Sequence, residues 1–376
     1  MPPTNNIKLS ERITAAPARG PRNVMIDCAK GIGIMLIVLM HIKPFNLAFP
    51  HATNLLFSCV VSFFFFLSGV TFSLGDRNIW RIAKQRADGL LKPCLVVLFV
   101  LGLARIAGGR ASIEETVLTL TYLSGFSLPW PPLWFLPHLW LVSVFCAALL
   151  IYCKPMRESK VSQALILMAM LIVGYGAINA FSSVIANGQC EKITSFQPAL
   201  LECGLPFSAD LLLLSSAFFI SGHLFAAHVK ALSANLPRLI ASLVLLLVAG
   251  MWLTEPIDLN ARLYPYLVLT PVAAFLGTYV LLQVAAFATK VKIIAAPLSY
   301  CGNASLFILI FHTPILAWLL FHLPLWISSP LLVSVLAFVV PIVVCIGICY
   351  AVQHNRLLAP FMLPRKTKSV GAATAG

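Results

Sequence analysis

The sequence has few charged residues, and acidic ones are especially scarce. Only 10% of its 376 residues are Asp, Glu, Lys or Arg, whereas 60% are apolar and the mean hydropathy is +0.94. A soluble protein of this length needs a larger charged surface, so the composition excludes a soluble fold and makes the lipid bilayer the solvent for most of the chain. Twelve acidic residues stand against 26 Lys and Arg, a formal charge of +14. The basic residues fall in short clusters between apolar runs, which is how membrane topology is encoded, and we expect no nucleic-acid partner.

The sequence also lacks the short motifs of several enzyme classes. It contains no P-loop, no Gly-x-Ser-x-Gly elbow, no His-Glu-x-x-His and no paired cysteines at metal-binding spacing. We therefore expect no bound metal. Residues 1–23 are polar and rich in Pro and Arg, and no cleavage site of small residues follows the first apolar run. This is unlike a secretory signal, so the first apolar run is expected to stay in the mature protein.

Ten apolar segments of a length that suits membrane-spanning helices follow one another along the chain. They run about 17–25 residues and lack the alternation of barrel strands. Within lipid each segment must satisfy its own backbone hydrogen bonds, which favours helices. We predict an all-α polytopic membrane bundle over 24–350, with polar tails at 1–23 and 351–376. The predicted spans are 24–43, 54–74, 91–107, 133–152, 161–181, 207–227, 238–254, 264–288, 298–321 and 330–350.

The distribution of basic residues predicts the orientation of these spans. If the N-terminus is inside, 20 of the 26 Lys and Arg residues fall on the inner side and five on the outer side, with Lys30 within the first span. This bias predicts that both termini are cytoplasmic. In the outer loop at 108–132, the apolar stretch 116–128 is too short to span and is followed by prolines. A re-entrant or interfacial segment is expected there.

The ten cysteines fall into two groups. Eight lie in or beside apolar runs, where small buried hydrophobes are the usual interpretation. Cys190 and Cys203 instead share one polar outer loop. They pair as a disulfide if that loop faces an oxidising compartment, or they stay free.

The first apolar segment carries ionisable residues where lipid should exclude them. Asp27, Lys30 and His41 fall within about 40° of one face at 100° per residue, and such residues usually mark function. Asp27 and Lys30 are one turn apart and free to pair. His41 lies about 16 Å further along the axis, too far for Asp27 to orient it as a triad carboxylate does. The alternatives are an anchoring ion pair at the inner boundary and an interfacial histidine at the outer one.

A basic cluster occupies the inner loop after the second span. Five cations stand within sixteen residues, which is more than orientation requires: Arg77, Arg81, Lys84, Arg86 and Lys92. Such a cluster suits a polyanionic cytosolic ligand such as a nucleotide with phosphates, and anionic lipid headgroups are the competing partner.

Two similar motifs stand near the inner ends of two outward-to-inward segments. Phe65-Phe66-Leu67-Ser68-Gly69 resembles Phe218-Phe219-Ile220-Ser221-Gly222. Close helix contact through small residues explains the pair, and the alternative is an internal repeat of the kind found in transporters.

Further polar residues are candidates for substrate binding. Ser305 and His312 are seven apart and share a helical face, whereas Asn303 and His312 lie about 180° apart. His312 is expected to face the bundle rather than lipid. Trp134 and Asp210 are weaker candidates of the same kind.

At residues 22–41 the sequence closely resembles the opening helix of the membrane acyltransferase 3 family, in which a basic residue precedes a histidine by eleven positions. Lys30 and His41 match that spacing, with Lys where Arg is common. The Phe-Phe-Phe-Leu-Ser-Gly run at 64–69 is similar to the family's second helix, and residues 133–137 to its Trp-Phe-Leu block. Residues 302–306 with 311–312 resemble a late helix. The residue sequence of the first helix is most similar to that of the fucose acetylase-like branch, which includes nodulation-factor and exopolysaccharide O-acetyltransferases.

The resemblance implies an O-acyltransferase of the cell membrane (the inner membrane in bacteria) that moves an acetyl group from acetyl-CoA to a sugar hydroxyl of a glycan. His41 would act as general base, with Asp27 and Lys30 in the catalytic stripe. Lys30, Arg81, Lys84 and Arg86 would hold the phosphates of CoA. The family often has a second arginine three positions after the first, but Gly89 stands there after Arg86. A succinyl or other acyl donor, a transporter or flippase of a glycan or its lipid-linked precursor, and a scaffold subunit remain alternatives.

Overall fold

The computed structural model describes residues 23–365, apart from residue 76 and residues 187–189, 191–193 and 197–198. Over these residues the chain is helical and forms no strand beyond an isolated bridge between Asp258 and Leu263. The longer helices are α1 (Val24–Met40), α3 (Pro50–Val70), α4 (Ile79–Gly89), α5 (Leu91–Ala107), α6 (Ile113–Tyr122), α7 (Phe135–Tyr152), α9 (Lys160–Ala186), α11 (Leu212–Leu224), α13 (Leu236–Met251), α14 (Leu269–Ala288), α15 (Lys292–Asn303), α16 (Ser305–His322) and α17 (Pro330–His354). Short helices connect them: α2 (Lys43–Ala48), η2 (Pro131–Trp134), α8 (Lys154–Glu158), α10 (Ala199–Glu202), η3 (Pro206–Leu211), α12 (Ala226–Lys230), η4 (Leu323–Leu325) and α18 (Ala359–Met362).

Every predicted apolar segment contains a helix, but the predicted count of ten spans is not confirmed. Within the described part of the chain, seven helices are long and apolar enough to cross a membrane, or eight if α4 and α5, bent by 45°, count as one span. The helices α1 and α13 are shorter, at 17 and 16 residues. The predicted span 298–321 is divided at Ala304 into α15 and α16.

The predicted tails lie mostly outside the described residues. This holds for 1–22 and for 366–376. At the C-terminal end, α17 continues to His354, beyond the predicted boundary at 350, and α18 follows. The cytoplasmic side of both tails stays a prediction from the distribution of basic residues.

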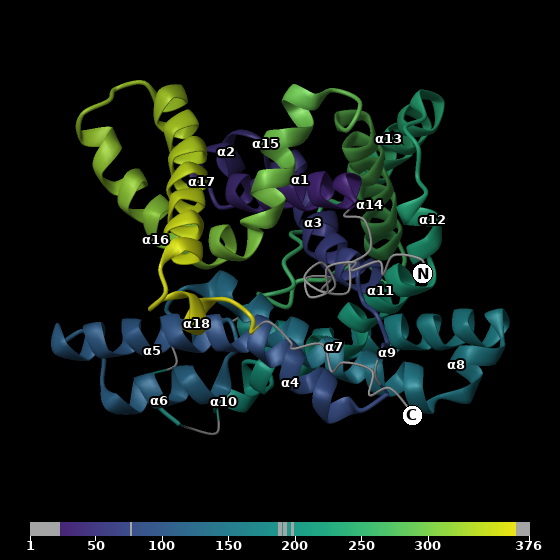
Figure 1. The fold of residues 1–376 in the computed structure, drawn as a ribbon, viewed down its shortest axis with the longest axis horizontal. Helices are drawn as coiled ribbons and strands as arrows, with labels where there is room; N and C mark the ends of the chain where they lie inside the picture. The colour runs from purple at the N-terminus through teal and green to yellow at the C-terminus, as the bar shows by residue number, and fades with distance from the viewer. Residues whose placement is uncertain (1–22, 76, 187–189, 191–193, 197–198, 366–376) are drawn as a thin grey trace, which may run out of the picture.

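The helices gather in two groups. In Figure 1, α5, α7 and α9 run across one half of the molecule, whereas α13, α14, α16 and α17 stand in the other half, where α1 also lies. Large apolar side chains are exposed along α9 and α17, for example Leu165, Met168, Val335 and Val343. Apolar side chains that face outward along whole helices are suited to lipid rather than water, which is the environment that the composition predicts.

The two similar Phe-Phe-x-Ser-Gly motifs meet at one helix crossing. A Cβ on Gly69 of α3 would fall 1.8 Å from the Phe219 carbonyl oxygen, and a Cβ on Gly222 of α11 would fall 1.9 Å from that of Phe66. Each glycine thus admits the backbone of the other helix, as small residues do in membrane helix pairs. Close packing therefore accounts for the repeated motif.

A second glycine crossing fixes the first helix. A Cβ on Gly31 of α1 would lie 2.0 Å from the Leu298 carbonyl oxygen of α15, and a Cβ on Gly302 would lie 2.0 Å from that of Asp27. The backbone of Asp27 is therefore pressed against α15, and the Asp27 residue is buried. This contact sets the position of α1, and hence of the stripe that carries Lys30 and His41.

The C-terminal segment fastens the bend between α4 and α5. Lys92 forms an ion pair with Asp88 at 2.7 Å and donates a hydrogen bond to the Leu363 carbonyl at 2.6 Å. The Asp88 carboxylate also accepts a hydrogen bond from the backbone N–H of Arg365. These contacts hold the end of α4, the helix that carries Arg86.

In the loop at 108–132, where a re-entrant or interfacial segment is predicted, the chain forms the ten-residue helix α6, which begins at a Ser112 cap. It packs beside α5, where Arg105 and Glu115 form an ion pair at 2.8 Å. Its last residue, Tyr122, is buried against the segment that carries Cys203. The segment is therefore not a further span. It belongs to a structured region, called the cap below, which consists of α6, the residues packed on it (Cys190, Leu200 and Cys203) and the turn at 258–263.

Candidate active site

A cavity of about 450 Å³ runs along the first helix. On α1 it is lined by Lys30, Ile34, Ile37, Met40 and His41, which recur at helical spacing. The segments α3, η2, α7 and α16 supply most of the other walls, with lining residues Phe57, Val61, Phe64, Leu67, Ser68, Thr71, Trp134, Phe135, Leu136, Leu139, Ser305, Leu306 and Leu309. The volume lies within the range of small-molecule sites, about 300–1,000 Å³.

The cavity has two polar ends and an apolar middle. At one end Lys30 and Arg86 line it, and the Arg86 guanidinium stands 4.9 Å from the centre of the Phe72 ring. At the other end are His41, Asp258 and Asn260. The two ends are separated by the eleven residues between Lys30 and His41, about 16 Å of helix.

The orientation of His41 follows from its hydrogen bond. Its Nδ1 lies 2.7 Å from the Ile37 carbonyl oxygen, one turn back on α1. A carbonyl only accepts, so Nδ1 carries a proton and the neutral ring has its lone pair on Nε2. Because His41 lines the cavity, a ligand bound there can contact the imidazole ring that carries this basic nitrogen.

His312 supports the His41 ring from α16. The two ring centroids are 5.1 Å apart in an edge-to-face arrangement, and His312 is fully buried. The Nδ1 of His312 lies 2.7 Å from the Ile308 carbonyl, which sets its tautomer in the same way. His312 therefore packs against the His41 ring and limits its movement.

The loop between α13 and α14 brings a carboxylate to the His41 end. The Asp258 side chain accepts hydrogen bonds from the backbone N–H groups of Asn260 at 2.8 Å and Ala261 at 3.3 Å. Backbone hydrogen bonds between Asp258 and Leu263, at 2.9 and 2.8 Å, close the turn. Burial raises the pKa of the Asp258 carboxyl, while those N–H groups and the charges of His41 and Arg262 oppose the rise.

Arg262 holds this turn in place. Its guanidinium is fully buried and binds both carboxylate oxygens of Asp210, at 2.9 and 3.1 Å, and donates to the Asn260 carbonyl at 2.6 Å. It also lies 5.3 Å from the centre of the Phe126 ring. Arg262 adopts φ +56°, a conformation that costs energy for a residue with a side chain and is sustained here by these contacts.

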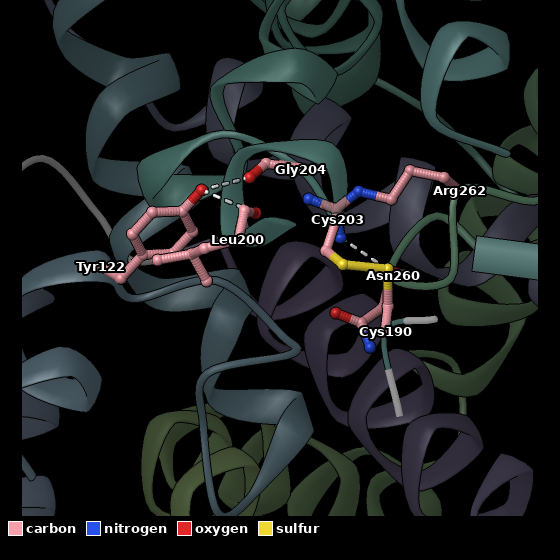
Figure 2. Close-up of a disulfide and its surroundings, with 7 residues drawn as sticks. All are labelled: Tyr122, Cys190, Leu200, Cys203, Gly204, Asn260 and Arg262. Carbon is pink, nitrogen blue, oxygen red and sulfur yellow. Dashed lines mark hydrogen bonds between the residues drawn. A yellow bond between two sulfur atoms is a disulfide. The ribbon is translucent and has the colours of Figure 1, made fainter. Parts of the chain in front are cut away.

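A disulfide closes the segment that packs on Arg262. Cys190 and Cys203 are bonded, so of the two alternatives left open by the sequence the structure has the pair (Figure 2). The next residue, Gly204, has φ +120°, and a Cβ there would fall 2.4 Å from Nη2 of Arg262. The Tyr122 hydroxyl donates to the Gly204 carbonyl (Figure 2), and burial raises the pKa of Tyr122 to about 12.

The structure brings together five of the residues predicted from the sequence. Lys30, His41, Arg86, Trp134 and Ser305 all line the cavity, although they come from four different elements, α1, α4, η2 and α16. His312 joins them indirectly, through its ring contact with His41.

Five other predicted residues do not line the cavity. Arg81 and Lys84 are exposed on α4, and Asn303 is exposed at the end of α15. Asp27 is buried against α15, and the Asp210 carboxylate is bound by Arg262. Asp210 therefore holds Arg262 in the cap and does not contact a ligand in the cavity.

Sequence reasoning missed Asp258, Asn260 and Arg262. Their signal was present, because an Asp and an Arg stand close together in the polar loop after 254. Nothing in the spacing connects that loop with a histidine more than two hundred residues earlier. Among the described residues, no group of three His, Cys, Asp or Glu side chains is arranged to hold a metal ion.

The fold and cavity define a multi-span membrane protein with a buried site that holds a base and cations. In comparison with protein families, the chain matches the acyltransferase 3 family, described as an acyltransferase domain, over residues 23–350. The chain belongs to this family, which confirms the family that the first helix indicated. No curated protein and no solved structure matches the chain.

Proposed function

We propose that this protein is a membrane O-acyltransferase that moves an acetyl group from acetyl-CoA to a sugar hydroxyl of a surface or secreted glycan. Membership of the acyltransferase 3 family supports the acyl transfer. The observation that carries the rest is a single cavity that joins Lys30 and Arg86 at one end to His41 at the other.

The shape of the cavity suits a long donor with a charged head. Phosphates of CoA would be held by Lys30 and Arg86, since ammonium and guanidinium groups bind phosphate by charge-assisted hydrogen bonds. The neutral arm of the donor would lie against Ile34, Ile37 and Leu67 in the apolar middle. An arm that extends along α1 brings the thioester to the His41 end, about 16 Å from Lys30.

His41 would take the proton from the acceptor. Its Nε2 accepts the hydroxyl proton as the sugar oxygen attacks the thioester carbonyl carbon, and the new C–O bond forms. When the tetrahedral intermediate collapses, the C–S bond breaks and the CoA thiolate leaves. The proton passes from the imidazolium to that thiolate, so His41 is regenerated. The hydrogen bond to Ile37 keeps Nδ1 protonated throughout.

The two ends of the cavity would then serve two compartments. With cytoplasmic termini, as the charge distribution predicts, the Lys30 end faces the cytosolic supply of donor and the His41 end faces outward. The glycan would enter at the outer end, where Asn260 lines the wall beside His41, and Trp134 lines the same cavity. A nodulation-factor or exopolysaccharide acceptor agrees with the branch that the first helix resembles, and a cell-membrane location with the apolar helices.

A transporter or flippase is less well supported. Its sequence support was the repeated Phe-Phe-x-Ser-Gly motif, which the reciprocal contacts of Gly69 and Gly222 explain as helix packing. The other support is the polar face of the first helix, and two of its residues, Lys30 and His41, line a cavity that is equally suited to an enzyme.

One assay tests the proposal. Purified protein in detergent is given acetyl-CoA labelled in the acetyl group and candidate glycans, and the label is followed into the glycan by mass. We expect transfer by the wild type and a loss of about 10²–10⁴-fold in His41→Ala, the usual contribution of a general base. His322→Ala serves as the control because His322 is half-buried at the end of α16 and does not line the cavity. A His41→Ala protein that inserts normally and still acylates would contradict the assignment of the base.

A further inference from the structure

The cavity is lined by more basic than acidic side chains, and its carboxylate, Asp258, is the residue of interest. Among the described residues that line it, three can carry positive charge, namely Lys30, His41 and Arg86, and Asp258 is the single carboxylate. Asp258 belongs to the His41 end, because its loop lies over the start of α3, where Asn54 donates to the Glu255 carbonyl at 3.5 Å. The nearest source of negative charge for His41 in the cavity wall is therefore Asp258.

Building on the proposed function, we propose that Asp258 is a positioning residue that stabilises the imidazolium of His41 during acyl transfer. In a Ser-His-Asp triad one carboxylate both orients the imidazole through Nδ1 and stabilises its charge. Here the two tasks are divided. The Ile37 carbonyl binds Nδ1 at 2.7 Å and sets the orientation, and Asp258 supplies the negative charge from a different element.

The turn presents the Asp258 carboxylate in a fixed geometry. Both backbone N–H groups of the turn that bind it end on Oδ1, so these hydrogen bonds do not use Oδ2, and Asp258 lines the cavity. Arg262, next to Ala261, is locked by Asp210 and by the Asn260 carbonyl. A carboxylate held in this way needs no rearrangement when charge develops on His41, which is the condition for effective electrostatic stabilisation.

The other ionisable groups around His41 do not substitute for Asp258. His312 on α16 packs on the ring and adds no negative charge. Arg262 is positive and is bound to Asp210. Lys30 and Arg86 are at the far end of the cavity, about 16 Å along α1.

The test compares Asp258→Asn with Glu255→Gln. Asparagine keeps the Oδ1 acceptor of the turn and removes the charge, whereas Glu255→Gln removes the same charge from an exposed site in the same loop. We expect Asp258→Asn to lower kcat about 10- to 100-fold, part of the effect of losing the base itself, with little change in KM for acetyl-CoA. Because an adjacent negative charge favours imidazolium, its loss should also move the acidic limb of the kcat/KM profile to lower pH by about one unit. Glu255→Gln should change neither quantity.

A second readout does not depend on turnover. The reaction of His41 with diethyl pyrocarbonate is followed against pH, with the modified site identified by peptide mass. The midpoint should fall by about one pH unit in Asp258→Asn and stay in place in Glu255→Gln. If the wild type transfers no acyl group but the midpoint moves, the proposed function fails and the relationship between Asp258 and His41 stands. If activity falls with no movement of either midpoint, or if Asp258→Asn behaves as the wild type, Asp258 does not support His41 and the proposal is overturned.

Discussion

Arg262 and Asp210 form a buried two-point ion pair that joins the loop before α14 to η3, the short helix before α11, 52 residues away in the sequence. Both side chains are fully buried, and the guanidinium also binds the Asn260 carbonyl in the turn that carries Asp258. The pair therefore lies one step behind the cavity wall. Through it, the disulfide-closed segment that contacts Arg262 at Gly204 is connected to the His41 end of the cavity.

Replacing Asp210 with Asn should damage the protein although Asp210 does not line the cavity. The change leaves the Arg262 guanidinium buried without a countercharge, and loss of one member of such a pair costs about 3–5 kcal/mol. We expect a lower thermal midpoint in detergent and reduced acyl transfer, because the 258–263 turn loses its anchor. The double variant Asp210→Asn, Arg262→Met should recover part of the lost stability, since it removes the uncompensated charge. An unchanged midpoint in Asp210→Asn would contradict this account of the cap.

The wall of the cavity formed by the first helix was readable from the sequence. Helical geometry alone placed Lys30 and His41 on one face about 16 Å apart, and both line one cavity. The length of the apolar runs located a helix in every apolar segment, because long apolar runs are satisfied in lipid almost only by helices.

The opposite wall was not readable, for a physical reason. Asp258 reaches the cavity by way of an irregular turn, held by an ion pair between Arg262 and Asp210, and neither periodicity nor spacing encodes such a contact. The same limit applies to the break at Ala304, which an apolar run conceals and which separates Asn303 from Ser305. Basic residues of one cluster were likewise treated alike, although Arg86 lines the cavity and Lys84 is exposed.

Removing the disulfide should destabilise the cap. The bond closes a short segment between Cys190 and Cys203, 13 residues apart, and a loop of this size is expected to contribute about 3 kcal/mol through the entropy of the unfolded chain. The double variant Cys190→Ser, Cys203→Ser should unfold at a lower temperature than the wild type. Dithiothreitol should lower the wild-type midpoint in the same way and leave the double variant unchanged. Equal midpoints with and without reductant in the wild type would show that the bond adds nothing to stability.

The two cations at the Lys30 end of the cavity should both contribute to binding of the donor, whereas the exposed Lys84 should not. Loss of a charged hydrogen-bonding partner costs about 1.5–3 kcal/mol, so Lys30→Gln and Arg86→Gln should each raise KM for acetyl-CoA about tenfold or more. Lys84→Gln is the matched control, because it removes the same charge from the same helix as Arg86 at an exposed position. Its KM should stay within about threefold of the wild type. A rise in KM in Lys84→Gln equal to that in Arg86→Gln would indicate that the phosphates lie outside the cavity.

The crossing of α3 and α11 should not tolerate a single methyl group. In Gly69→Ala and in Gly222→Ala the new Cβ meets a backbone carbonyl at less than 2 Å, and a backbone cannot move aside as a flexible side chain can. Overpacking of this kind typically costs about 1–3 kcal/mol, so each variant should show a lower thermal midpoint or a loss of folded protein in detergent.

Gly176→Ala in α9 provides the control for this crossing. It makes the same substitution within a helix, at a position where a Cβ would meet nothing within 4 Å. Alanine has a higher helix propensity than glycine, so this variant should be at least as stable as the wild type. If Gly69→Ala and Gly176→Ala have the same midpoint, the two helices do not approach closely at the paired motifs. The repeated Phe-Phe-x-Ser-Gly pattern would then need another explanation, and the transporter interpretation would regain its support. A lower midpoint in Gly69→Ala alone is the result that close packing requires, because only that methyl group enters the backbone of a neighbouring helix.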